Sequence, residues 1–169
     1  MAARLDSNVR RLNHMPAQYP FVPRSTTYLV PGQYWSIPLS NVLFACGRVL
    51  QLRDGNSRNF IAGLMDWSGE EPPSAATIRG CKLIAHGQVH VKTIHENDGE
   101  ILGCLSLEES GIEVPLSLDE APGADCHLRR GFDVLRIASA QEQRELSVFS
   151  TWGYGAIRIR AEQAFGSGA

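Results

Sequence analysis

Lysine is nearly absent from this chain: Lys82 and Lys92 are the only two among 169 residues, and arginine supplies the other basic side chains. The formal net charge is −2, so there is no general electrostatic attraction to nucleic acid or to a membrane surface. No apolar run approaches the ~20 residues that a membrane-spanning helix needs. The first residues carry charges where a signal peptide requires an apolar core. We therefore expect a cytoplasmic protein with neither a membrane nor a nucleic-acid partner.

Closely spaced cysteine pairs are also lacking. The four cysteines lie far apart, with no Cys-x-x-Cys motif, at Cys46, Cys81, Cys104 and Cys126. Disulfide-stabilised domains are usually shorter and richer in cysteine. We predict four free thiols, with Cys46 and Cys104 buried because each lies in an apolar run.

Phosphate-binding and metal-binding signatures are missing as well. There is no Gly-x-Gly-x-x-Gly and no Gly-Lys-Ser segment. His86 and His90 would share a helix face and could then hold one metal ion. However, Val89, Val91 and Thr93 alternate with polar residues, which favours a strand, and residues i and i+4 of a strand are about 13 Å apart. The sequence therefore predicts no metal and no cofactor.

Catalytic pairs remain as alternatives. Cys126 and His127 are adjacent, so in an extended chain their side chains point in opposite directions and cannot form a nucleophile–base pair. Cys46 with His90, brought together by the fold, is one open possibility. A carboxylate pair for glycoside hydrolysis is another. We predict that the protein is not an enzyme, with a cysteine- or carboxylate-based hydrolase as the third-ranked reading.

The length predicts a single domain that buries about 70% of its unfolded surface. Four prolines among the first 31 residues prevent regular helix there. We therefore expect a loosely ordered N-terminal extension over residues 1–30, a folded domain over 31–165 and a frayed tail over 166–169.

The stretch from Pro31 to Leu52 predicts a central hairpin. Its two apolar runs, 33–39 and 42–52, are joined by Ser40-Asn41, and Gly47 marks a bulge, a bend or a close backbone approach. We expect the fold class α+β, dominated by a curved antiparallel sheet that is partly open and barrel-like, with one or two short helices. The other expected elements are strands over 59–67, 87–93, 132–138, 146–152 and 157–160, a helix over 75–79 capped by Ser74, and a loop over 108–125.

Charge is distributed unevenly along the chain. Residues 93–128 contain no lysine or arginine but nine of the eighteen acidic residues. A solvated acidic loop is one explanation. A surface that docks a basic partner is the other, because clustered charge of one sign raises association rates and selects partners. The candidate partner-binding residues are Glu96, Asp98, Glu100, Glu108, Glu109, Glu113, Asp119, Glu120 and Asp125.

The hairpin motifs carry a family resemblance. Pro-Gly-Gln-Tyr-Trp-Ser-Ile-Pro-Leu at 31–39, followed by Phe-Ala-Cys-Gly-Arg-Val-Leu at 44–50, resembles the opening of the immunity protein 26 family of bacterial polymorphic toxin systems. The stretch from Ile101 to Leu116 resembles a later segment of that family. Gln33 stands where the family usually has an acid, and Ser106 where a proline is expected.

The resemblance implies a small cytoplasmic protein that binds and neutralises a cognate toxin. We therefore predict stoichiometric binding of a basic toxin domain through the acidic surface, with a nuclease as the candidate class of toxin. The alternative is a small barrel-like binding module for a nucleic acid or a peptide. The three tryptophans, Trp35, Trp67 and Trp152, are expected in or near the core.

Overall fold

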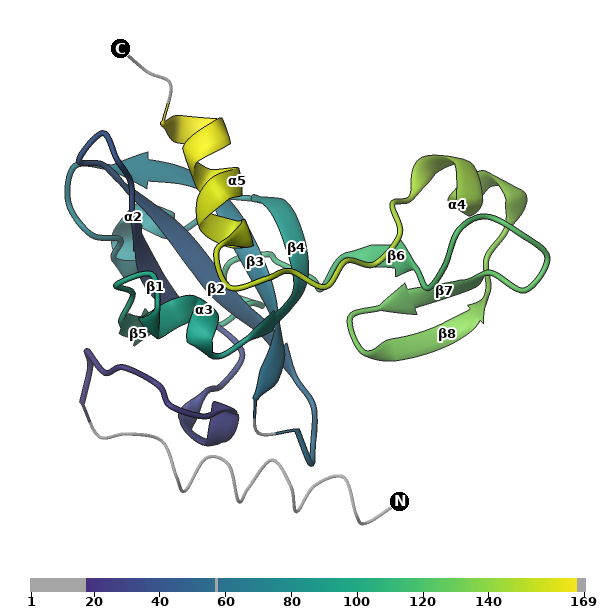
Figure 1. Ribbon diagram of the computed structural model, residues 1–169, viewed down its shortest axis with the longest axis horizontal. Coiled ribbons are helices and arrows are strands. Elements are labelled where there is room, and N and C mark those ends of the chain that lie inside the picture. The colour runs from purple at the N-terminus through teal and green to yellow at the C-terminus, as the bar shows by residue number, and fades with distance from the viewer. Residues whose placement is uncertain (1–17, 57, 167–169) are drawn as a thin grey trace.

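The computed structural model describes residues 18–56 and 58–166, which form two antiparallel sheets and a few short helices (Figure 1). The predicted α+β, strand-dominated class is confirmed, although the sheets do not close into a barrel. A five-stranded sheet has the order β4-β3-β2-β1-β5, and a three-stranded sheet has the order β6-β7-β8. The strands are β1 (Gln33–Pro38), β2 (Phe44–Leu52), β3 (Asn59–Gly69), β4 (Leu83–His90), β5 (Ile101–Cys104), β6 (Leu116–Leu118), β7 (His127–Arg130) and β8 (Asp133–Ile137). The helices are η1 (Thr26–Tyr28), α2 (Ala75–Ile78), α3 (Lys92–His95), α4 (Ala140–Glu145) and α5 (Ala156–Phe165).

The central hairpin forms as predicted, with β2 in the middle of the large sheet. Gly47 lies opposite Trp35, and a Cβ atom there would sit only 2.3 Å from the indole ring. The glycine therefore marks a close approach, because only a residue without a side chain lets the ring lie flat on β2.

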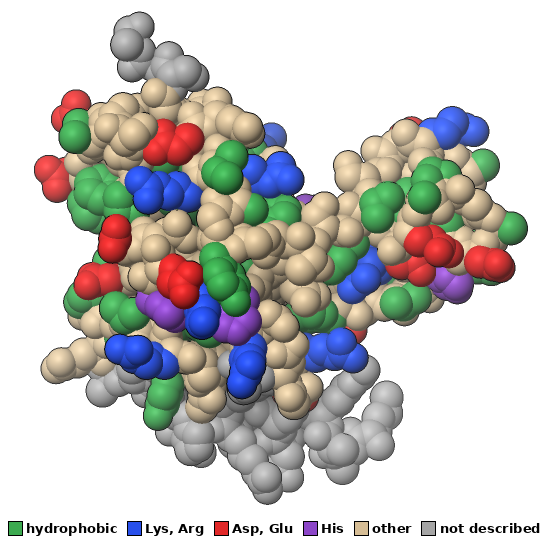
Figure 2. Space-filling model, viewed as in Figure 1, with side chains coloured by type: hydrophobic (Ala, Val, Ile, Leu, Met, Phe, Trp, Pro, Cys, Tyr) green, Lys and Arg blue, Asp and Glu red, His purple; other side chains and the backbone are tan. Residues whose placement is uncertain are grey.

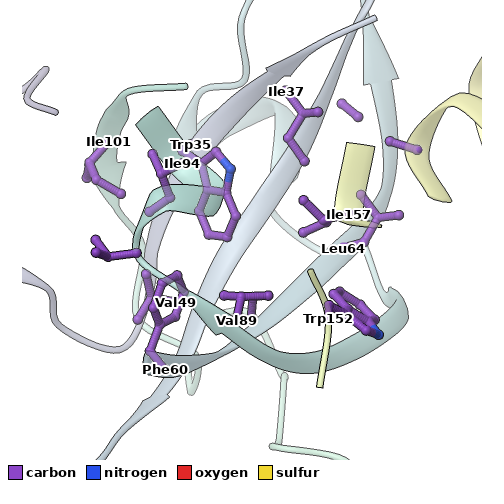
Figure 3. Packing of buried hydrophobic residues seen from close by; sticks show 14 of the residues in the cluster. Trp35, Ile37, Val49, Phe60, Leu64, Val89, Ile94, Ile101, Trp152 and Ile157 are labelled. Atoms are coloured by element: carbon purple, nitrogen blue, oxygen red, sulfur yellow. The ribbon is translucent and has the colours of Figure 1, made fainter. Parts of the chain in front are cut away.

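Apolar side chains cover both faces of the large sheet. One face carries the main core, in which Trp35 packs edge-on to Phe60 at 6.0 Å and lies beside Ile94 of α3 (Figure 3). Ile157 of α5 enters the same core. The opposite face packs under α2, whose N-cap Ser74 accepts a hydrogen bond from the Thr77 N–H, as predicted for this helix. Because both faces are covered, the central strands are almost continuously apolar.

The N-terminal segment from Gln18 to Val30 packs against the domain. Phe21 forms a two-hydrogen-bond bridge with Ile101, and Leu29 is fully buried in the main core. The remainder of the extension predicted for residues 1–30 lies outside the described residues, as do positions 167–169 of the predicted tail.

Residues 116–149 form a separate lobe that the sequence did not predict (Figure 1). Its own core is small, with Leu118, Cys126, Leu128 and Ala138 buried. The lobe is attached through Gln51, which accepts a hydrogen bond from the Phe132 N–H and donates one to Asp133. The predicted loop over 108–125 is therefore only partly correct, because β6 lies within it.

Three predicted strands differ from the structure. The strand over 87–93 is correct as far as His90, where α3 takes over. The segment 146–152 is extended but pairs only at single residues, Val148 and Thr151. Residues 157–160 lie in α5, because Ile157 and Ala161 are one helical turn apart and both buried, whereas Ile159 is exposed. Two apolar residues are too few to distinguish a period of 2 from one of 3.6.

The turn between β1 and β2 contains three residues rather than the predicted two. The Leu39 N–H donates to the Leu43 carbonyl, which encloses Ser40, Asn41 and Val42. Glu162 of α5 accepts hydrogen bonds from the Ser40 N–H and hydroxyl at 2.7 and 2.9 Å. Val42 has a φ of 62° and is 83% exposed, an unusual conformation for a β-branched residue.

Replacing Val42 by asparagine is expected to raise the free energy of unfolding by about 1 kcal/mol, because asparagine tolerates left-handed backbone and valine does not. Urea unfolding measures the change. Val22→Asn, at an exposed residue with ordinary backbone, is the control and should stay within about 0.5 kcal/mol of wild type. Equal effects of the two substitutions would contradict the strain at Val42.

Candidate protein-binding site

The segment between β5 and β6, residues 105–115, is a compact loop with its own hydrogen bonds. We call it the acidic loop, because Glu108, Glu109 and Glu113 project from it. Ser106 fixes its first turn, since its carbonyl accepts from the Ser110 N–H at 3.1 Å and its hydroxyl accepts from the Glu109 N–H at 3.0 Å. The Ile112 N–H closes the loop on the Leu107 carbonyl at 2.9 Å.

A buried arginine holds the acidic loop against the sheet. Arg48 lies on β2 and is fully buried, and its Nη2 donates to the Leu105 carbonyl at 2.5 Å. Its Nη1 and Nη2 also lie 3.5 and 3.4 Å from the Ser110 hydroxyl. Both ends of the loop's tight turn therefore depend on one guanidinium, which fixes where the loop sits on the sheet.

Arg48 pairs with no carboxylate in the described part of the chain, and its Nε has no hydrogen-bond partner there. Burial lowers the pKa of its guanidinium, while nearby Cys46, Cys104 and Tyr34 act in the opposite direction. A buried charge that is only partly hydrogen-bonded is costly to keep. The hydrogen-bond acceptors of the Arg48 guanidinium are the Leu105 carbonyl and the Ser110 hydroxyl, both in the acidic loop.

The three glutamates of the acidic loop are exposed and form no ion pair with any described residue. Ile112 lies among them, half-buried against the apolar residues on the α2 side of the large sheet. Hollows of about 280 and 570 Å³ lie beside the loop, and Ile112 and Glu113 line both of them. The arrangement offers a partner an apolar contact surrounded by free carboxylates.

The structure separates the nine predicted acidic residues into three groups. Glu108, Glu109 and Glu113 lie on the acidic loop. A second group, at the turn between α3 and β5, contains Glu96, Asp98 and Glu100, and a third, between β6 and β7, contains Asp119, Glu120 and Asp125. On the face shown in Figure 2, acidic side chains alternate with basic side chains and histidines rather than forming one patch.

Two of these acids have partners within the chain. Glu96 lies 3.9 Å from the Lys92 ammonium. Asp119 accepts from the His127 N–H at 2.7 Å, which lowers the pKa of its carboxyl, and its other oxygen is 3.5 Å from His127 Nδ1. Asp119 therefore stabilises the β6–β7 turn, which leaves the acidic loop as the group least engaged in the protein's own structure.

The cysteine and histidine side chains that the structure describes form no nucleophile–base pair. Cys46 is buried, its thiol lies 3.6 Å from the Gly47 carbonyl, and burial raises its pKa, so it stays protonated at neutral pH. His90 Nδ1 accepts a hydrogen bond from the Lys92 N–H. His86 and His90 both lie on β4, the geometry in which they are too far apart to share an ion. No group of three metal-binding side chains occurs within residues 18–56 and 58–166.

All four cysteines are free, as predicted, but the predicted burial of Cys104 is wrong. Cys46 is buried, whereas Cys104 is the exposed last residue of the short strand β5. Apolar neighbours in the sequence do not ensure that Cys104 is buried, because alternate residues of a strand face opposite sides of the sheet.

No family model, curated protein or solved structure matches this chain. None of the helices in the described segments is long and apolar enough to cross a membrane.

The sequence did not predict a role for Arg48. Its signal was present, as a lone charged residue in the middle of the apolar run over 42–52.

Thiol labelling of the native protein at pH 7.5 is expected to modify Cys104 first and the half-buried Cys81 more slowly. Although the residue is exposed, partial desolvation of its sulfur atom raises the pKa of the Cys104 thiol, so its labelling rate should still climb with pH above about 8.5, where that of free cysteine levels off. Cys46 and Cys126 should react only after unfolding. Recovery of just two thiols from denatured, unreduced protein would contradict this prediction.

Arg48→Met should loosen the acidic loop, because the Leu105 carbonyl loses its donor. We expect amide hydrogen exchange at Ser110 and Ile112 to rise at least about tenfold, while the amides of β3 keep their protection. Hydrogen exchange followed by mass spectrometry provides the measurement, with the exposed Arg79→Met as control. Unchanged exchange in the loop would show that Arg48 does not hold it.

Proposed function

We propose that this protein binds a basic toxin domain and neutralises it by direct, stoichiometric contact, as a cytoplasmic immunity protein. The observation that carries the proposal is the acidic loop, whose three unpaired, exposed carboxylates are fixed in place by buried Arg48. A loop already ordered in the free protein loses little conformational entropy on binding, so more of its interaction energy appears as affinity.

The chemistry of the loop supports a basic protein as the partner. Exposed glutamates around Ile112 supply long-range attraction together with a small apolar contact, a combination common at protein interfaces. Nuclease toxins are commonly basic, because their substrates are polyanions. The motif resemblance to immunity protein 26 supports the same class of partner, and the alternative nucleic-acid module would require a basic surface where this one is acidic.

The test uses Glu108→Lys together with Glu109→Lys, and separately Glu113→Lys. Each exposed substitution should change the free energy of unfolding by no more than about 0.5 kcal/mol. Charge reversal should lower the association rate about tenfold or more and weaken its salt dependence. Binding to the toxin domain encoded beside this gene is measured at low and high salt, and protection of cells that express that domain gives the functional readout.

The matched control is Glu70→Lys with Glu71→Lys, two exposed neighbours outside the acid-rich stretch 93–128. Glu142 is unsuitable as a control, because it pairs with Arg136 and caps α4. If the loop variants protect cells as well as wild type and bind with unchanged salt dependence, the acidic loop is not the contact surface.

A further inference from the structure

Each edge of the large sheet is bridged at one residue by another segment of the chain. At β4, the Gln88 N–H donates to the Ser150 carbonyl at 2.9 Å, and the Trp152 N–H donates to the Gln88 carbonyl at 2.8 Å. At β5, Phe21 and Ile101 exchange two hydrogen bonds of 3.1 and 2.8 Å. Such a bridge obstructs the addition of a strand from another molecule at that edge.

The small sheet has one covered edge and one open edge. Leu118 of β6 donates its N–H to the Ser147 carbonyl at 2.9 Å and accepts from the Phe149 N–H at 2.7 Å. No segment within the described residues pairs with the outer edge of β8. In Figure 1, β8 forms the rim of the lobe, clear of the large sheet. Of the four sheet edges, β8 is the one that no segment of residues 18–56 or 58–166 bridges.

Three of the five residues of the open strand are apolar, and its two charged side chains, Asp133 and Arg136, both have hydrogen-bond partners within the chain. All five of its residues are exposed, and Val134, Leu135 and Ile137 retain 58%, 50% and 57% of their surface. Neither lysine nor proline interrupts it. Its one cation, Arg136, is neutralised by two hydrogen bonds to Glu142, at 3.0 and 2.6 Å.

We propose that β8 pairs in antiparallel orientation with β8 of a second copy, so that two lobes form one six-stranded sheet across a two-fold axis. A strand added at this edge must itself be unpaired and exposed, and a second copy always supplies such a strand. In an antiparallel pair related by a two-fold axis, facing residues lie on the same side of the sheet, which restricts the register.

The register centred on Leu135 fits these chemical constraints. Leu135 then lies beside Leu135 of the second copy, Val134 beside Arg136, and Asp133 beside Ile137, so no like charges face each other. A register shift between β7 and β8 leaves Leu135 without a partner on β7, and its half-exposed side chain is available for this contact.

Sedimentation equilibrium of the full chain tests the pairing. A strand pair of this length buries less area than a standard interface, so we expect a dissociation constant of about 10–100 µM. Leu135→Lys places two lysines opposite each other and should weaken the dimer at least about tenfold. Val148→Lys is the control, in the same lobe but at the covered edge, and should dimerise like wild type.

Crosslinking tests the register with a second variant. Leu135→Cys, with Cys81→Ser and Cys104→Ser to remove the accessible thiols, should form an intermolecular disulfide, because Cα atoms of facing residues are about 4.5–5.5 Å apart. Val148→Cys in the same background should not. A protein that stays monomeric at about ten times the expected dissociation constant, a Leu135→Lys variant that dimerises like wild type, or equal crosslinking at both positions would overturn the proposal.

Discussion

A single buried guanidinium connects the core of this protein to its candidate binding surface. Arg48 lies at the centre of the large sheet, where desolvation of a charge is costly, and its hydrogen-bond acceptors come from a loop more than fifty residues further along the chain. The loop is therefore not an independent surface feature. Its position depends on the same strand that organises the core, so the core determines where its three carboxylates stand.

The strand that carries Arg48 makes other long-range connections too. Gly47 receives the ring of Trp35, Val49 enters the main core, and Gln51 binds the turn that attaches the small lobe. Arg48 lies on the opposite side of the sheet from its neighbours Gly47 and Val49, because strand side chains alternate between faces. A change in this strand is therefore expected to affect the core, the acidic loop or the lobe, depending on which residue is replaced.

Residues 147–152 are neither helix nor strand, but they have a structural role at the edges of both sheets. Residues 147–152 run from the small sheet to the large one and hydrogen-bond to an edge of each, at Leu118 and Gln88. The same backbone groups that satisfy β4 and β6 also join the lobe to the domain. β8 lies beyond the reach of this segment, which leaves its apolar edge available to another molecule.

The sequence by itself determined the strand-dominated class, the central hairpin, the capped helix at Ala75–Ile78 and the free cysteines. These features follow from local patterns: apolar runs, turn residues, a capping serine and wide cysteine spacing.

Tertiary structure decided the remaining features of the fold and of the candidate site. Ile157 and Ile159 fit a strand or a helix equally well until packing buried Ile157 with Ala161. Nine acids that lie within one stretch of the sequence form three separate groups, because β5 and β6 stand between the connections that hold them. Arg48 acquired its role only when the fold brought the Leu105 carbonyl and the Ser110 hydroxyl to it, since long-range pairing is not encoded in local spacing.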